Sequence, residues 1–375
     1  MFVVAIMALF LPFYICLGIW VIELIYFLAK GKLIPCIKDV DKSNWILAFI
    51  LLIFCVSVFY RNYLGAVCTL AILIIYAMTC YYKFVIDKEL FEYCIDLIIY
   101  MSIFCALYGL FEYFRIISNF TDDFAVLILN SPENRLNSVF FNANYYAMMI
   151  EFFVLMCVYK ILSCKNVERI LYYLAIIAMN FVLLYLCGCR TAWPALAISM
   201  LVMLFVLKKR RLAGGLILLV GCVFIAFLMF PQYFPRTNNI FNYFGIRVDI
   251  WKVAIQGIKD HFLFGEGPLT YFHIYHHYAN ETLATQHAHS LYLDPFLSFG
   301  IVGVSMLVYY AYGHFKSFIQ VYKQGYDPYL MALIIGTIVT TLVHGLLDYT
   351  VFFVQTGFVF LMIISSYHLY EKKRS

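Results

Sequence analysis

A polar segment of about sixty residues, 231–289, interrupts a chain that is otherwise strongly apolar. It carries Arg247 and, between positions 273 and 289, five histidines, the last two in His287-Ala288-His289-Ser290. An imidazole titrates near neutral pH and can remove a proton from a hydroxyl group. A guanidinium group binds phosphate oxygens through paired N–H donors. These residue types predict chemistry on a phosphate-bearing substrate, with His289 as the catalytic base and His287 as its competitor.

Two arginines are candidates for binding a diphosphate. Arg190 follows Cys189 at the junction of two apolar stretches, where a charge is costly and normally has a partner or a function. Arg247 lies just before a helical pattern in the polar segment. The alternatives are a structural ion pair for Arg190 and a simple pairing of Arg247 with Asp249.

Other polar residues near the ends of apolar stretches are candidates for substrate binding or for support of the site. Asn142 and Asn144 can cap the helix that follows them or bind sugar hydroxyls. His344 and Asp348 are four residues apart, so a continuous helix would carry both on one face. Such a pair could orient the site, bind the acceptor or form a hydrogen bond between packed helices. Arg135 precedes the asparagine pair and is assigned the same supporting role.

The histidine-rich segment does not predict a metal site. Its spacings match no known ligand pattern, the HExxH motif is absent, and the segment contains no cysteine ligands. Nucleotide-binding motifs of the Walker and GxGxxG types are also absent from the sequence. We therefore expect no metal, no other cofactor and no use of cytoplasmic ATP.

Membrane-spanning helices must position these residues. The chain is 65% hydrophobic and only 13% charged, whereas soluble domains carry about 25% charged residues. A bilayer-spanning helix needs about 20 apolar residues, so the sequence predicts a single all-α polytopic membrane domain, 1–375. About eleven helices, within a range of ten to twelve, are expected at 3–29, 45–60, 63–82, 93–115, 142–162, 170–187, 191–207, 212–230, 289–311, 329–346 and 349–370.

Positive charge alternates between the connecting segments. Those expected on one side hold 14 Lys and 4 Arg, and the positive-inside rule makes that side cytoplasmic. The N-terminus is then outside, the C-terminus inside and the long segment 231–288 outside. Six of the eight cations on the outer side are arginine, which suits recognition of phosphate. The alternative is that these arginines reach toward lipid headgroups.

Two extracytoplasmic loops are long enough to build a site. The smaller is 118–141 and the larger is 231–288. In the larger loop, the apolar spacing from Val248 to Phe262 predicts an amphipathic helix lying on the membrane surface. The aromatic run that follows could stack on sugar rings or anchor the loop at the interface.

The order of these motifs resembles the O-antigen ligase and O-antigen polymerase (Wzy-type) family of membrane glycosyltransferases, most strongly from about residue 135 to 350. In two places the chain departs from the family pattern, with Phe262 in place of a usual proline and Ser290 in place of a usual asparagine. The motifs that carry the resemblance are Arg135 through Asn144, Arg190-Thr191-Ala192-Trp193, Gly245-x-Arg247-x-x-x-Trp251, Asp260 through Pro268, Ala288-His289-Ser290-x-Tyr292-Leu293 and Gly300-Ile301-Val302-Gly303.

The resemblance implies a GT-C-like enzyme of the bacterial cytoplasmic membrane that works at the outer face without a metal. Its donor would be a glycan linked to undecaprenyl diphosphate, and its acceptor another glycan. Carried over by position, His289 is the base, and Arg190 and Arg247 are the diphosphate ligands. Membrane lipids and other polysaccharide assembly proteins are expected partners, whereas nucleic acid is not.

Three functions compete. A polymerase joins one lipid-linked glycan to another, and we favour it because no dedicated acceptor-binding feature is evident. A ligase transfers the same donor glycan to lipid A core, a wall polymer or a protein. A transporter of lipid-linked glycans would place charged or broken-helix sites near the bilayer midplane and often shows internal repeats. This chain shows no evident repeat, and its charged candidates gather at the outer surface.

Overall fold

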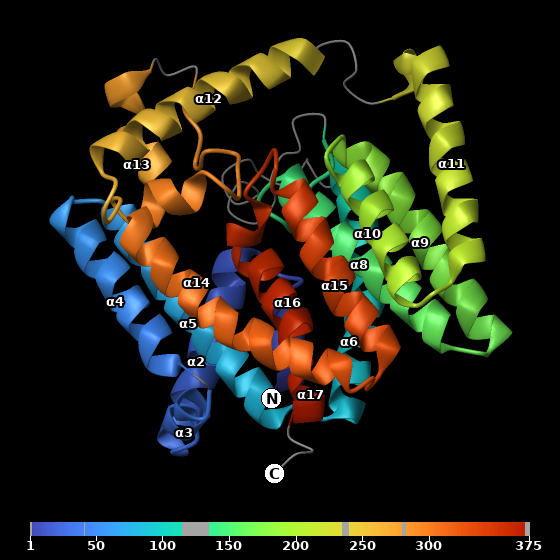
Figure 1. Cartoon of the computed structure of the whole chain (residues 1–375), viewed down its shortest axis with the longest axis horizontal. Coiled ribbons are helices and arrows are strands. Elements are labelled where there is room, and N and C mark those ends of the chain that lie inside the picture. The colour runs from blue at the N-terminus through green and yellow to red at the C-terminus, as the bar shows by residue number, and fades with distance from the viewer. Residues whose placement is uncertain (1, 41, 115–134, 235–239, 280–282, 372–375) are drawn as a thin grey trace.

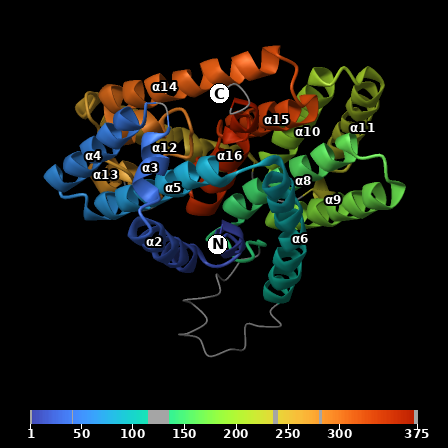
Figure 2. The same ribbon diagram turned by 90° about the horizontal axis from the view of Figure 1, so that it is seen from below.

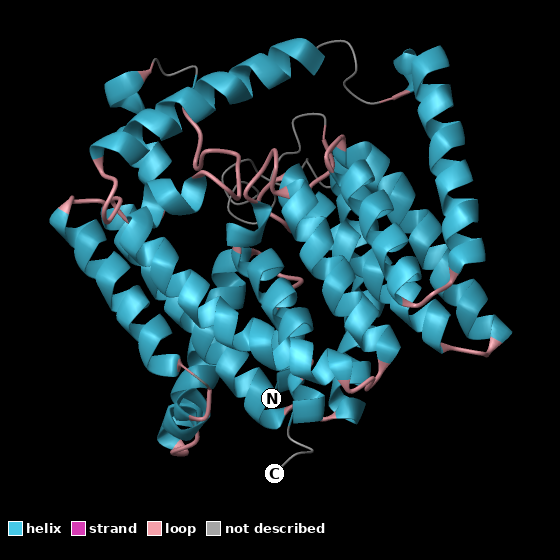
Figure 3. Ribbon diagram, in the orientation of Figure 1, coloured by secondary structure: helices cyan, strands magenta, loops and turns pink. Residues whose placement is uncertain are grey.

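The computed structural model describes residues 2–40, 42–114, 135–234, 240–279 and 283–371, and within these ranges the regular structure is helical, with no strand (Figure 3). The all-helical prediction is therefore confirmed for the described part of the chain. In chain order the elements are α1 (Phe2–Ala8), α2 (Phe13–Ala29), α3 (Leu33–Lys38), α4 (Ser43–Phe59), α5 (Tyr63–Val85), α6 (Lys88–Tyr113), α8 (Ala143–Ser163), α9 (Val167–Cys187), α10 (Ala192–Val206), α11 (Arg210–Met229), η1 (Pro231–Tyr233), α12 (Ile240–Asp260), α13 (Thr270–Tyr278), α14 (Asp294–Lys323), α15 (Pro328–His344), η4 (Thr350–Phe352), α16 (Val354–Ser365) and α17 (His368–Glu371).

Six of the described helices are long and apolar enough to cross a membrane: α5, α6, α8, α9, α11 and α14. Four more, α2, α4, α10 and α15, are apolar but shorter. The chain is thus a multi-pass membrane protein. The expected number of about eleven spanning helices stays a prediction, and so does the side of the membrane on which each terminus lies.

Three predicted spans differ clearly from the observed helices, and the last of the eleven, 349–370, is divided into η4, α16 and α17. The first, 3–29, is broken before Phe13 into α1 and α2, because Pro12 lacks the N–H that a continuous helix needs. The two pieces pack on each other, and Trp20 Nε1 donates to Ala5 O at 3.0 Å. The ninth span, predicted at 289–311, instead begins at Asp294 and continues to Lys323.

Asparagine and aspartate side chains begin several of the helices. Asn62, Asp87, Asn142, Asn166 and Asp327 each accept a hydrogen bond from a backbone N–H in the first turn of the following helix. These caps satisfy amide groups that have no partner within the helix. Helix starts are therefore determined locally, at the residues where polar side chains meet apolar sequence.

The central helix is α8, which is buried along nearly its whole length. It packs against α6, α9, α10, α15 and α16. By contrast, α11 is almost wholly exposed at the edge of the molecule (Figure 1). Figure 2 shows the same arrangement from below, with α4 at one side and α9 and α11 at the other.

The long polar segment is largely helical. It contains η1, α12 and α13, while 235–239 and 280–282 lie outside the described residues. Figure 1 shows α12 lying across one end of the bundle. The helix α12 covers most of the segment in which we expect an amphipathic helix, but its residues Ile250, Val253 and Ala254 are buried in a cluster that includes residues of α13 and α14. Its placement on the membrane surface stays a prediction. Most of the smaller predicted loop, 118–134, lies outside the described residues.

Candidate active site

His289 lies in the linker between α13 and α14, five residues before α14 begins. We expected it to begin the ninth helix and project from its end; that prediction was wrong. Its backbone has φ 47°, a left-handed conformation that is costly for a residue with a side chain. The neighbouring segment holds this conformation in place, since Leu291 N donates to Gly345 O at 2.8 Å and Asp294 N donates to Ser290 O at 3.0 Å.

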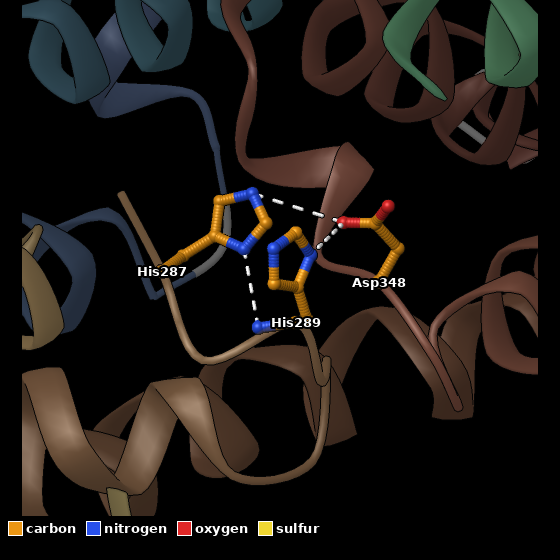
Figure 4. A group of neighbouring side chains, drawn as sticks. All are labelled: His287, His289 and Asp348. Carbon is orange, nitrogen blue, oxygen red and sulfur yellow. Dashed lines mark hydrogen bonds and ion pairs between the residues drawn. The ribbon is translucent and has the colours of Figure 1, made fainter. Parts of the chain in front are cut away.

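Asp348 is the partner of His289. Nδ1 of His289 lies 3.1 Å from Oδ1 of Asp348 (Figure 4). The other carboxylate oxygen, Oδ2, accepts from Asn144 Nδ2 at 2.5 Å, and the Tyr349 N–H donates to Oδ1 at 2.8 Å. Burial by itself raises the pKa of Asp348, but the neighbouring His289 outweighs it and holds that pKa well below its usual range. Asp348 is therefore an ionised carboxylate that can only accept hydrogen bonds.

This contact determines the tautomer of His289. Because Asp348 accepts, Nδ1 of His289 must carry a proton, and the neutral ring then has its lone pair on Nε2. The His289 side chain is 22% exposed, whereas that of Asp348 is 3% exposed. His289 thus has a basic nitrogen that a substrate can reach, supported from behind by a buried carboxylate. In this arrangement a buried carboxylate orients a histidine base.

His287 has a different environment. Its side chain is only 5% exposed, and its Nδ1 accepts the backbone N–H of His289 at 3.2 Å. The ring proton is then on Nε2, which lies 3.3 Å from the Tyr145 hydroxyl and 3.7 Å from Asp348 Oδ1. Burial, with the charge of His289 and of Arg247, lowers the pKa of His287 to about 3, although Asp348 acts in the opposite direction. His287 is therefore a neutral ring whose only lone pair accepts the His289 N–H, so it presents no basic nitrogen to a substrate.

Arg135 and the two asparagines form the support of Asp348. Arg135 donates from Nη2 to Asn144 Oδ1 at 2.6 Å and from Nε to Cys187 O at 2.8 Å. Asn144 in turn donates to Asp348, as described above. Asn142 caps α8 by accepting from the N–H groups of Asn144 and Tyr145. Of the two roles considered for Asn142, helix capping is the one that the contacts show.

His344 and Asp348 do not form a pair on one helix, contrary to the sequence interpretation. The helix α15 ends at His344, and Asp348 lies in the linker beyond it. His344 Nδ1 instead contacts Glu151 Oε1 of α8 at 2.6 Å, with both side chains completely buried. Sequence reasoning missed Glu151. A lone acidic residue inside the apolar stretch 142–162 was a signal for it, because charge within a membrane helix normally has a role.

The two arginines proposed to bind diphosphate lie on different elements. Arg190 is in the turn between α9 and α10, where Gly188 ends α9 in a left-handed conformation. Arg247 is within α12 rather than before it, and its charge acts on His287. Both side chains are half-buried. Cys189 directly precedes Arg190, and its Sγ lies 3.9 Å from His344 Nε2.

His287, His289 and Asp348 also have residue types that bind metals, and one ligand atom from each lies within 4.8 Å of the others. A metal-bound histidine normally donates its second ring N–H to an acceptor. In His287 that second nitrogen, Nδ1, accepts an N–H, so the ring proton occupies Nε2, the nitrogen that would face a metal. These contacts fit a pair of hydrogen-bonded histidines better than a metal site.

Comparison with known families adds a second line of evidence. Residues 172–308 match the family model described as O-antigen ligase. Over these residues the chain is similar to the O-antigen ligase family. The resemblance predicted from its motifs is thereby confirmed, and it implies a membrane glycosyltransferase of the O-antigen ligase or polymerase type. A comparison with curated proteins found no match to the chain.

The matched segment contains only part of the candidate site. Arg190, Arg247, His287 and His289 lie within 172–308. The residues that support these four lie outside the matched segment. They are on or next to α8 and at the end of α15, which pack beside it. These supporting residues are Arg135, Asn142, Asn144, Glu151, His344 and Asp348.

Proposed function

We propose that this protein of the O-antigen ligase family is a polysaccharide polymerase. It transfers a glycan from undecaprenyl diphosphate to a sugar hydroxyl of another lipid-linked glycan, at the outer face of the bacterial cytoplasmic membrane. The observation that carries the proposal is the His289–Asp348 pair, which exposes one basic nitrogen within the family's domain.

The reaction is a single displacement. His289 Nε2 takes the proton of the acceptor hydroxyl while that oxygen forms a bond to the anomeric carbon of the donor. The bond between that carbon and the diphosphate oxygen breaks, its electron pair leaves with the diphosphate, and the configuration at the carbon inverts. Asp348 stabilises the imidazolium that forms, and water later removes the proton. No step requires a metal.

Arg190 and Arg247 are proposed to bind the diphosphate. Negative charge grows on the leaving group in the transition state, and preorganised cations stabilise it more there than in the ground state. Arginine suits this role because its fixed geometry matches two phosphate oxygens. Membrane lipids surround the enzyme, and other polysaccharide assembly proteins are expected partners.

The test is complementation of cells that lack this gene, with surface glycan read on a gel and protein level checked. His289→Ala and Asp348→Asn should each lower glycan formation at least about 100-fold, the usual contribution of acid–base catalysis. His276→Ala is the matched control, because His276 is an exposed histidine of α13 in the same segment. A chelator added to membranes should leave activity unchanged. An unaltered long-chain ladder from the His289 variant would remove His289 from the mechanism.

The alternative is a ligase, which has the same base and arginines but a different acceptor. Cells without a polymerase place a single repeat unit on the final acceptor. Cells without a ligase accumulate free polymer on its lipid carrier. The glycan that accumulates with His289→Ala therefore distinguishes the two. If labelled lipid-linked glycan failed to reach the outer face, the transporter alternative would replace both.

A further inference from the structure

A fully buried pair of charged residue types lies between α8 and α15. His344 Nδ1 is 2.6 Å from Glu151 Oε1, and Thr340 donates to the other carboxylate oxygen at 3.4 Å. Both Glu151 and His344 are 0% exposed. Burying such a pair in an apolar bundle has a large desolvation cost, and apolar side chains would pack the two helices together without it. The pair therefore needs an explanation other than the stability of the helices.

The same two elements carry the support of the catalytic pair. Asn144 is the second residue of α8, and Glu151 lies seven residues later on the same helix, about two helical turns away. Asp348 follows His344 by four residues. Asn144 donates to Asp348, so α8 is connected to the end of α15 and its linker at two successive levels. A displacement of the end of α15 would carry Asp348 with it.

The end of α15 also contacts the segments that hold the base and one of the arginines. Gly345, the residue after His344, accepts the Leu291 N–H, two residues beyond His289. The approach is close, since a Cβ on Gly345 would lie 2.6 Å from Leu291 Cβ. On its other side, His344 Nε2 lies 3.9 Å from the sulfur of Cys189, which precedes Arg190.

From these contacts we propose that Glu151 is a positioning residue for the glycosyl transfer. It holds His344, and His344 holds the end of α15 where Asp348 meets His289 and where the turn bearing Arg190 packs. This inference rests on the proposed function. Glu151 does not touch the substrate; it determines how well the base is aligned, and misplacement by about 1 Å can lower a rate about 100-fold.

Two variants test the role with the full-length protein in nanodiscs. Glu151→Leu leaves His344 buried without a partner and can impair folding. The double variant Glu151→Leu/His344→Leu removes both members, a replacement that is often neutral or stabilising for a buried pair. The substrate is lipid-linked oligosaccharide extracted from cells that lack this gene. We expect the double variant to fold, to keep its KM for the donor within severalfold, and to lose about 100-fold in kcat.

Two controls accompany it. Glu151→Gln keeps an oxygen that can accept from His344, so it should recover most of the lost kcat. Tyr82→Phe removes a buried hydrogen bond to Ser366, 2.7 Å long, between α5 and the residue that ends α16. It should alter thermal stability without altering kcat per folded molecule.

A folded double variant with the kcat of the unmodified protein would show that the pair is only structural and overturn the proposal. His289→Ala, measured in the same assay, distinguishes failure of the Glu151 role from failure of the proposed catalytic site. Loss of activity in His289→Ala with normal kcat in the double variant rejects the role of Glu151 alone. Normal activity in both rejects the proposed catalytic site itself.

Discussion

His287 and His289 are separated by one alanine, yet their side chains have different surroundings. The His289 backbone turns into the left-handed region, and its ring is partly exposed beside Asp348. His287 is enclosed and uses one ring nitrogen to hold the backbone of His289. Hydrogen-bond direction, rather than residue type, thus distinguishes a candidate base from its support.

The low pKa of His287 predicts a dependence of stability on pH. Burial is the main cause that lowers this pKa to about 3 in the folded protein, from about 6.5 in an unfolded chain. Between these values the unfolded state binds more protons, so the free energy of unfolding falls as pH decreases through this window. His287 should therefore contribute a fall in Tm between pH 7 and pH 4.5, and His287→Gln should lack that contribution. The pKa of Asp294, raised by burial to about 6, acts in the opposite direction in both proteins. Thermal unfolding in detergent at the two pH values measures the difference.

Asp348 and Arg247, two charged groups that act on His287, do not change the sign of its contribution. Asp348 has a pKa below its usual range and stays ionised through the window, and Arg247 stays positively charged. His276→Gln is the control, because it removes an exposed histidine from the same segment. Equal pH dependence in the unmodified protein and the His287 variant would contradict the assignment of His287 as a buried neutral ring.

At the level of elements, a glycine turn attaches the α12–α13 segment to the membrane helices. Asn62, at the start of α5, donates to the carbonyl oxygens of Glu266 and Pro268 at 3.0 and 2.9 Å. Gly267 N–H donates to Ser298 O at 2.8 Å. These contacts join the start of α5, the turn after α12 and the first turns of α14.

Gly300 tests this attachment. It interrupts α14 with φ 58°, and a Cβ there would lie 2.4 Å from backbone atoms of Leu263 and Phe264. We expect Gly300→Ala to lower the free energy of unfolding by about 1–3 kcal/mol or more, and to reduce activity, because the alanine is strained and displaces the turn. Thermal unfolding and the transferase assay measure both effects.

Gly221→Ala is the matched control for Gly300→Ala. Gly221 lies within α11, and no heavy atom would contact its added Cβ within 4 Å. Alanine favours a helix over glycine by about 1 kcal/mol, so this variant should be neutral or slightly more stable. If both alanine variants behaved alike, close packing at Gly300 would not be needed for the attachment.

For the whole molecule, the distribution of cations predicts the orientation in the membrane. The segments expected inside hold 14 of the 16 lysines, whereas six of the eight outer cations are arginine. We expect a fluorescent protein fused to the C-terminus to fluoresce, since it folds in the cytoplasm. Alkaline phosphatase inserted in 231–288 should be active, because it needs the oxidising side. Phosphatase inserted after Lys209 is the inner control, and activity there would reverse the predicted orientation.

Local sequence determined much of the architecture. Apolar stretches of suitable length predicted the helices, and Asn142 marked the start of α8, because hydropathy and capping act over a few residues. Motif order predicted a resemblance to the O-antigen ligase family, which the match of residues 172–308 confirms. The start of α14 was missed by five residues, since the apolar pattern alone does not show that the linker turns left-handed at His289.

Only the tertiary structure decided which polar residues are partners. The sequence placed His344 with Asp348 by their spacing, but the helix ends between them and each finds a partner elsewhere. His289 and Asp348 are 59 residues apart, and Glu151 and His344 are 193 apart. Such contacts depend on which helix faces pack together, and a side-chain pattern along one helix does not specify its neighbour. The packing of α8 against α15 therefore decided how the candidate site is assembled.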